Sequence, residues 1–130
     1  MQGLSILLVD DEDRFRLTLS KRLSERGQEV TAVSSGMEAI HQMKKRDFDV
    51  VVLDVKMPGM DGLETLSELK KIRPDTEVIL LTGHSSMDSS IEGIRLGAFH
   101  FILKPCDIDR LLELIHEAHA AKRAAQSGSR

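Results

Sequence analysis

Four short apolar runs of this 130-residue chain are each followed by polar side chains that could do chemistry. They are Asp10, Asp11 and Glu12 after residues 4–9, Asp54 after residues 50–53, Thr82 after residues 78–81, and Lys104 at the end of residues 99–103. Clustered carboxylates repel one another, and oxygen ligands without His or Cys favour a hard cation, Mg²⁺ before Ca²⁺. A magnesium ion beside an aspartate, a hydroxyl and an ammonium group has the parts of a phosphoryl-transfer site. The metal and the ammonium would hold the charged oxygens while the carboxylate attacks in line.

Each of these residues has a plainer interpretation when it is taken alone. The acids at residues 10–13 could cap a helix and favour its positive end. Asp54 could be a turn residue and Lys104 a surface lysine, and Thr82 is ordinary for a strand end. The hypothesis of a phosphoryl site therefore depends on all of them reaching the same edge of one sheet.

Strand and helix patterns alternate along the chain. Apolar runs predict five strands, at residues 4–9, 29–33, 50–53, 78–81 and 99–103. A helix follows each strand, and the fourth, at residues 87–96, has only a weak helical pattern. Ser35 is the predicted cap of the second helix. The predicted inner faces of the other four are, in chain order, Phe15, Leu19 and Leu23; Met37, Ile40 and Met43; Leu63, Leu66, Leu69 and Ile72; and Ile108, Leu111, Leu112, Ile115 and His119. Five alternating units predict a doubly wound α/β fold with a parallel sheet in strand order 2-1-3-4-5 and helices on both faces. Ligands of such sheets bind beyond the carboxyl ends of the strands, where the polar residues stand.

Length and composition narrow the classes of protein that fit. The chain is long enough for one domain, and its net charge of −3 gives no electrostatic reason to expect direct binding to nucleic acid or a membrane. The single Cys106 cannot form an internal disulfide, and the first residues lack a signal-peptide pattern, so we expect a cytoplasmic protein. Apolar periodicity fades after Ala120. We therefore expect a domain over residues 1–122 and a tail over residues 123–130, either a frayed helix end with a linker or an artificial extension.

Four motifs together resemble the receiver domains of two-component response regulators. They are Leu-Val-Asp-Asp-Glu-Asp at 8–13, Leu-Asp-Val-Lys-Met-Pro-Gly-Met-Asp-Gly at 53–62, Leu-Thr-Gly-His at 81–84, and Leu-Lys-Pro at 103–105. The resemblance covers about residues 4–120, and residues 81–105 are similar to receivers attached to sigma-54-type activators. It implies the flavodoxin-like (βα)₅ version of the predicted fold.

The resemblance also implies a role for individual residues. Asp54 would be the phosphoacceptor, and Mg²⁺ would bind Asp11 directly, Asp10 through water, Asp54, and the backbone carbonyl of Lys56. Thr82 and Lys104 would bind the phosphoryl group, and Phe101 would turn inward as Thr82 moves. The resemblance further implies a cis Lys104–Pro105 bond and roles for Lys56 and His84 in tuning hydrolysis of the acyl phosphate.

The implied partner is a sensor histidine kinase or a phosphotransfer protein. The signal would reach an output domain or a second copy through the helix at residues 87–96, the strand at 99–103 and the last helix. The segment around that first helix is rich in poor helix formers, namely Gly83, Ser85, Ser86, Ser89, Ser90, Gly93 and Gly97. We therefore expect it to be the least stable helix.

Three other functions compete with this interpretation. A phosphatase of the haloacid-dehalogenase type needs a second acid two residues after its nucleophile, where this chain has Lys56. A flavin or nucleotide carrier needs a Gly-rich phosphate loop after the first strand, where this chain has acids. An interaction module that has lost phosphorylation would not need the intact set of acids, Thr82 and Lys104. The sequence leaves open whether the chain is a stand-alone regulator or the front of a longer one.

Overall fold

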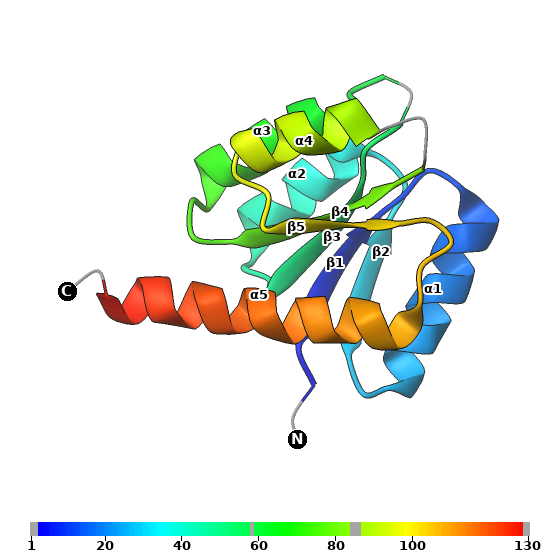
Figure 1. Ribbon diagram of the computed structural model, residues 1–130, viewed down its shortest axis with the longest axis horizontal. Helices are drawn as coiled ribbons and strands as arrows, with labels where there is room; N and C mark the ends of the chain where they lie inside the picture. The colour runs from blue at the N-terminus through cyan, green and yellow to red at the C-terminus, as the bar shows by residue number, and fades with distance from the viewer. Residues whose placement is uncertain (1–2, 58, 84–86, 129–130) are drawn as a thin grey trace.

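The computed structural model describes residues 3–57, 59–83 and 87–128. Within these residues five strands alternate with five helices (Figure 1). In chain order they are β1 (Ser5–Val9), α1 (Asp13–Glu25), β2 (Glu29–Val33), α2 (Gly36–Lys45), β3 (Val50–Asp54), α3 (Gly62–Ile72), β4 (Glu77–Thr82), α4 (Met87–Arg95), β5 (His100–Leu103) and α5 (Ile108–Gly128).

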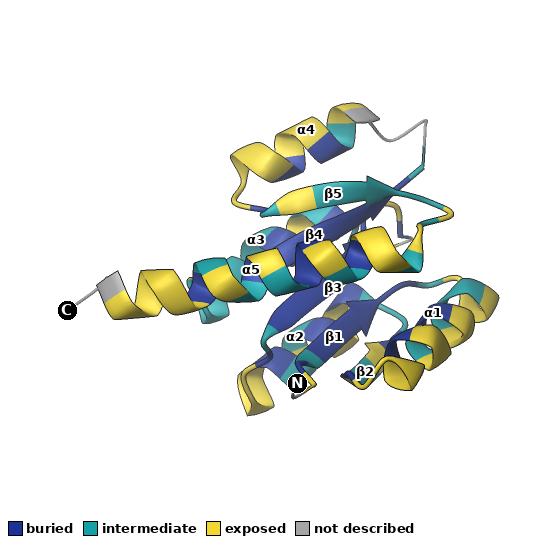
Figure 2. Ribbon diagram, turned by 60° about the horizontal axis from the view of Figure 1, so that its bottom comes forward, coloured by how far each residue is buried: buried dark blue, intermediate teal, exposed yellow. Residues whose placement is uncertain are grey.

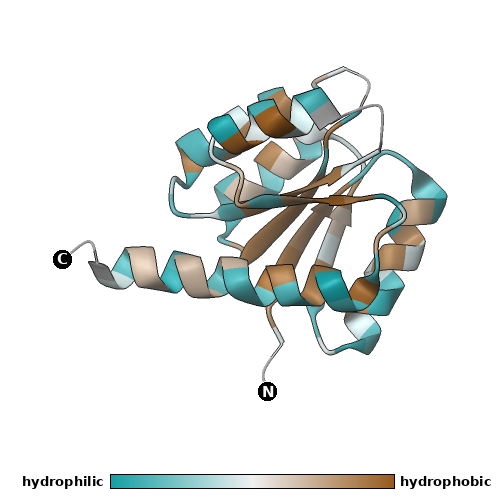
Figure 3. Cartoon of the chain, viewed as in Figure 1, coloured by the Kyte–Doolittle hydropathy of each residue, from teal (hydrophilic) through white to brown (hydrophobic). Residues whose placement is uncertain are grey.

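The five strands form one parallel sheet in the order β2-β1-β3-β4-β5, which confirms the predicted topology. Every residue of β3 is buried, because strands pair with it on both sides and helices cover both faces. The less apolar β2 lies at one edge and is partly exposed. The central strands are accordingly the most buried and most hydrophobic part of the chain (Figures 2 and 3).

Alternate residues of each strand point to opposite faces of the sheet, so the core has two halves. Leu7 and Leu53 belong to the half that α2 and α3 cover, with α4 beside them. Ile6 and Val52 belong to the half that α1 and α5 cover. Because the strands are parallel, their carboxyl ends all lie at one edge of the sheet.

The inner face of α2 differs from the prediction. Met37 is 62% exposed, while Ala39 and Met43 are buried and Ile40 packs at the edge of the core. Residues four positions apart share a helix face, whereas Met37 is two positions from Ala39 and points to the other side. The three-residue spacing of Met37, Ile40 and Met43 predicted Met37 on the inner face, but the small Ala39 is the residue that packs against the sheet. Ser35 does cap this helix, since its hydroxyl accepts a hydrogen bond from the backbone N–H of Glu38.

The last helix continues past residue 122, where the sequence predicts a tail. Lys122 is buried, and its Nζ donates hydrogen bonds to Asp47 Oδ2 at 2.8 Å and to the Phe48 carbonyl at 2.7 Å. We call these three residues the α5 clip. One turn later, Gln126 Nε2 donates to Asp75 Oδ2 at 2.6 Å. Residues 123–128 are therefore helical, and the domain boundary at residue 122 stays a prediction.

No helix within the described ranges is both long and apolar enough to cross a membrane.

Candidate functional site

The polar residues singled out in the sequence meet at one edge of the sheet. Asp10 follows the last residue of β1, Asp54 and Thr82 are the last residues of β3 and β4, and Lys104 follows β5. Lys104 Nζ lies 2.9 Å from Asp10 Oδ2 and 3.6 Å from Asp54 Oδ2. The strand order thus brings an ammonium group and two carboxylates together from three separate parts of the chain.

Asp54 is a buried carboxylate at the end of the central strand. Its Oδ1 accepts a hydrogen bond from the backbone N–H of Lys56 at 3.3 Å. Burial, reinforced by the negative charge of Asp10, raises the pKa of Asp54 to about 7. Lys104 and the Lys56 N–H oppose this shift of the pKa without cancelling it. A carboxylate whose charge is this poorly compensated attracts any cation that can reach it.

Asp10 is fully buried and has one oxygen without a hydrogen-bond donor. Its Oδ1 accepts from the backbone N–H of Glu12 at 2.8 Å, whereas Oδ2 has no hydrogen-bond partner among the described residues. Lys104 Nζ is close enough to Oδ2 for an ion pair but is not aligned for a hydrogen bond. Burial raises the pKa of Asp10, and Lys104 and the Glu12 N–H counteract it in part.

Lys104 is held by the acids around it. Besides its ion pairs with Asp10 and Asp54, its Nζ donates a hydrogen bond to Glu12 Oε1 at 2.5 Å and lies 4.4 Å from the centre of the Phe15 ring. Burial acts to lower the pKa of Lys104, but the contacts with Glu12 and Asp10 outweigh it and the pKa is raised. Lys104 is therefore a permanent positive charge at this edge of the sheet.

Thr82 and Phe101 occupy neighbouring strands. The Thr82 hydroxyl is buried and donates a hydrogen bond to the carbonyl of Gly83 at 3.1 Å. Phe101 is half-buried on β5 and packs against the half of the core that includes Leu80. The Lys104–Pro105 peptide bond that follows β5 is cis.

The acids at this edge fit a cation. Asp10, Glu12 and Asp54 each offer a carboxylate oxygen, and these three oxygens lie within 4.8 Å of one another. Asp10 Oδ2 accepts no hydrogen bond from the described residues, and burial raises the pKa of Asp54, so both oxygens suit a cation ligand. Asp11, the expected direct ligand, is half-buried and not part of this group. Glu12 was singled out with the other acids after the first strand, but it was not among the metal ligands that the resemblance implies.

Gly62 fixes the loop that follows Asp54, a role that the sequence pattern did not indicate. Its N–H donates to the Val55 carbonyl at 2.9 Å. A Cβ at this position would lie 2.4 Å from the Asp54 carbonyl oxygen and 2.6 Å from Val55 Cα. Because only glycine permits this approach, α3 begins directly against the end of β3 and holds the loop beside the site.

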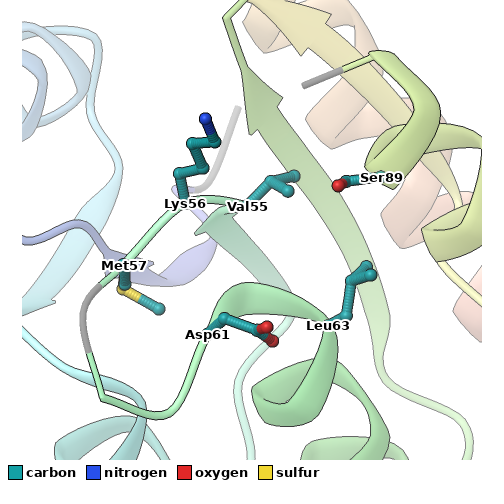
Figure 4. A pocket seen from close by; sticks show the side chains of 6 residues that line it. All are labelled: Val55, Lys56, Met57, Asp61, Leu63 and Ser89. Atoms are coloured by element: carbon teal, nitrogen blue, oxygen red, sulfur yellow. The ribbon is translucent and has the colours of Figure 1, made fainter. Parts of the chain in front are cut away.

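A cavity of about 500 Å³ opens beside the same loop (Figure 4). Its lining residues are Val55, Lys56, Met57, Asp61, Leu63 and Ser89. The exposed Lys56 side chain extends away from Asp61, which caps α3 by accepting from the Glu64 N–H at 2.9 Å. The tuning role of Lys56 stays a prediction, and His84, the other residue assigned that role, lies outside the described residues.

Comparison with known proteins gives a consistent result. A sequence model of the response regulator receiver domain matches residues 6–116. The transcriptional regulatory protein ZraR of Klebsiella oxytoca is 35% identical over 126 residues, which cover 97% of this chain and 28% of ZraR. The regulatory protein AtoC of Escherichia coli K12 is 37% identical over 113 residues, covering 87% of this chain and 24% of AtoC. This chain therefore spans about a quarter of the length of these curated relatives.

Solved structures agree with the sequence matches. NtrX from Brucella abortus has a TM-score of 0.92 at 32% identity, covering 98% of this chain and 30% of NtrX. A response regulator receiver domain protein from Clostridium thermocellum has a TM-score of 0.89 at 35% identity, covering 93% of this chain and 98% of that protein.

The fold, the acidic edge and these matches define the class: the chain belongs to the receiver domains of two-component response regulators. Within that family it is a receiver domain of the NtrC type, the group that its relatives ZraR, AtoC and NtrC represent. It is thus a signalling domain, in a family where phosphorylation of an aspartate is standard.

Proposed function

We propose that Asp54 accepts a phosphoryl group in a magnesium-dependent reaction. The observation that carries the proposal is the position of Lys104, whose Nζ lies between Asp10 and Asp54 at the strand ends. The donor is a phosphohistidine of a sensor kinase or phosphotransfer protein, or a small acyl phosphate. An Asp54 oxygen attacks the phosphorus, the bond from phosphorus to the donor breaks, and the donor leaves with that electron pair.

The side chains around Asp54 supply the charge and hydrogen bonds for this step. Asp10, Asp54 and either Asp11 or Glu12, with the Lys56 carbonyl, would hold the metal. When bound, Mg²⁺ neutralises the negative charge that collects between the carboxylates and the donor. Lys104 holds a phosphoryl oxygen by charge, and the Thr82 hydroxyl gives up its bond to the Gly83 carbonyl to donate to another.

The movement of Thr82 is the start of the switch in this proposal. When Thr82 moves toward the phosphoryl group, the Phe101 side chain on the neighbouring strand turns inward. This changes the conformation of the surface formed by α4, β5 and α5. The side chains of Ile91 and Ile94 on α4, and of Leu96 just after it, are exposed, and such an apolar group favours contact with an output domain or a second copy. The domain catalyses only its own phosphorylation and dephosphorylation and turns over no separate substrate.

Acetyl phosphate provides the direct test of the first step. Incubation of the protein with acetyl phosphate and Mg²⁺ should add one phosphoryl group, which intact-mass spectrometry detects. EDTA and the substitution Asp54→Ala should each abolish the gain, whereas Asp13→Asn, at an exposed acid outside the site, should leave it unchanged. No gain in the unaltered protein would contradict the proposal and favour an interaction module without phosphorylation.

A further inference from the structure

Glu12 makes the shortest contact of the three carboxylates around the Lys104 ammonium group. The Glu12 Oε1 distance is 2.5 Å, compared with 2.9 Å for Asp10 and 3.6 Å for Asp54, and the Glu12 contact is also a hydrogen bond. Glu12 and Lys104 are 92 residues apart in the chain, so this contact joins the start of α1 to the end of β5.

The three carboxylates differ in how freely they can leave Lys104. Asp10 and Asp54 are buried and stand at the ends of fixed strands. The Glu12 side chain is 63% exposed, and it makes no capping hydrogen bond to α1, although Glu12 is the N-cap residue. An exposed ion pair is weak because water solvates both charges when it opens. Glu12 is therefore the partner that Lys104 can lose most easily.

A lysine ammonium group has three hydrogen-bond donors. In the unphosphorylated domain three carboxylates surround them. A phosphoryl group on Asp54 brings about two negative charges and three strong acceptor oxygens to the same place. The only carboxylate hydrogen bond that Lys104 Nζ makes among the described residues is the one to Glu12, so the phosphoryl oxygens compete with Glu12 for this ammonium group. Glu12 is also the partner whose withdrawal leaves no buried carboxylate without its ion pair.

We propose that Glu12 is a positioning residue that occupies Lys104 in the resting state and competes with the incoming phosphoryl group for it. This inference rests on the proposed phosphorylation of Asp54. In this inference the Glu12–Lys104 ion pair slows phosphorylation of Asp54, and the free energy involved is that of one exposed ion pair. The rival role is that of a metal ligand, since a Glu12 oxygen lies within 4.8 Å of oxygens of Asp10 and Asp54.

Two substitutions distinguish competition by Glu12 for Lys104 from a general effect of the Glu12 negative charge. Glu12→Gln removes the negative charge, while Glu12→Asp keeps the charge but shortens the side chain by one methylene and draws it away from Lys104. The control Asp13→Asn removes a neighbouring charge that pairs with Arg16 instead. Initial rates of phosphorylation by acetyl phosphate at saturating Mg²⁺ are measured by intact mass. Binding of Mg²⁺ alone to each unphosphorylated variant is measured by calorimetry, and melting temperatures confirm that each is folded.

Competition predicts that both Glu12 variants are phosphorylated about three- to fivefold faster than the unaltered protein, the size expected for loss of one ion pair. The Mg²⁺ dissociation constant of Glu12→Asp should stay within about twofold, and Asp13→Asn should match the unaltered protein. Unchanged rates in both variants overturn the proposal, as does an increase in Glu12→Gln alone or an equal increase in Asp13→Asn. Weaker Mg²⁺ binding with slower phosphorylation also overturns it, and makes Glu12 a ligand. If the unaltered protein gains no phosphoryl group, the proposed function fails instead.

Discussion

At the scale of single residues, the site of the unphosphorylated domain has more negative than positive charge. Lys104 supplies one positive charge to Asp10, Glu12 and Asp54, and burial leaves two of these carboxylates with raised pKa values. The chemical state of Asp54 should therefore depend on pH and on cations near neutrality.

Asp54→Asn should stabilise the metal-free fold in a pH-dependent way. The pKa of Asp54 rises from 3.8 to about 7 in the fold, so between these pH values the folded state keeps a proton that the unfolded chain has lost. The stability contribution of Asp54 therefore falls as pH rises from about 4 to about 7, and the penalty is complete above that range. Urea unfolding in EDTA should show the Asp54→Asn variant to be more stable than the unaltered protein by about 4 kcal/mol at pH 8 and nearly equal to it at pH 4.

A difference that is the same at both pH values would contradict this account, because an uncharged effect of the substitution does not titrate. Added Mg²⁺ should stabilise the unaltered protein more than Asp54→Asn, since the cation compensates the same charge.

Lys56→Ala should change the lifetime of phosphorylated Asp54. The Lys56 side chain is exposed on the loop directly after Asp54, where a long cation can obstruct the water that attacks the acyl phosphate. We expect faster loss of the phosphoryl group in Lys56→Ala, followed by intact mass after removal of the donor. Lys45→Ala, in the last turn of α2, is a matched control. Equal decay in Lys56→Ala and the unaltered protein would exclude the tuning role.

At the scale of elements, α4 differs from the other helices in what it buries. It has nine residues, and its described buried positions are Ser90 and Gly93. Gly93 lets α4 approach β4 closely, because a Cβ there would lie 2.3 Å from Leu80 Cδ1 and the Leu80 side chain would have to shift. The helix thus approaches the sheet closely through residues that favour helix formation weakly and bury little apolar surface. This packing is consistent with the prediction that α4 is the least stable helix, and that stability stays a prediction.

Hydrogen exchange should show α4 as the least protected helix. A helix this short is marginal without strong packing, and its opening exposes little apolar area. Backbone amides of α4 should exchange faster than those of α5, measured by NMR or by mass spectrometry of peptic peptides. Peptides from α3, which buries Leu66 and Leu69, provide the internal comparison. Protection of α4 equal to that of α5 would remove the argument that α4 is poised to move.

At the scale of the whole molecule, the carboxyl and amino ends of the strands have different roles. One end carries the site, and the other carries the α5 clip, where Lys122 binds Asp47 and the Phe48 carbonyl. A buried lysine is rare unless it is paired, so this contact has a structural purpose. It attaches the second half of α5 to the loop between α2 and β3.

Lys122→Ala should destabilise the domain without touching the site. The substitution leaves the Phe48 carbonyl without its donor and removes the buried lysine stem, for a loss of about 2 kcal/mol in the free energy of unfolding. Urea unfolding measures the loss, and Arg123→Ala, at the next and exposed position, should change it by less than about 0.5 kcal/mol. Equal stability of Lys122→Ala and the unaltered protein would show that residues beyond the clip hold α5 in place.

The sequence predicts the fold and the meeting of Asp10, Asp54, Thr82 and Lys104 because both follow from chain order: alternating units dictate a parallel sheet, and the sheet brings its strand ends together. It does not predict contacts that depend on where one long side chain reaches. The bond from Glu12 to Lys104 is of this kind.

The same limit applies at the helices. Lys122 lies in a stretch where apolar periodicity has faded, so nothing along the chain marks it as buried. Met37 was assigned to the core by its spacing from Ile40 and Met43, whereas the orientation of α2 on the sheet buries Ala39 there.

The α5 clip has a mechanical consequence. A helix of 21 residues is about 30 Å long, and Lys122 stands about two-thirds of the way along it. If α5 tilts as a rigid rod when the loop after Lys104 moves, the clip is its fulcrum. A shift of about 1 Å at Ile108 then appears at Gly128 as a shift of roughly 0.4 Å in the opposite direction. Anything joined to the end of this helix would receive the signal as a reversed and reduced displacement, in effect a small rotation.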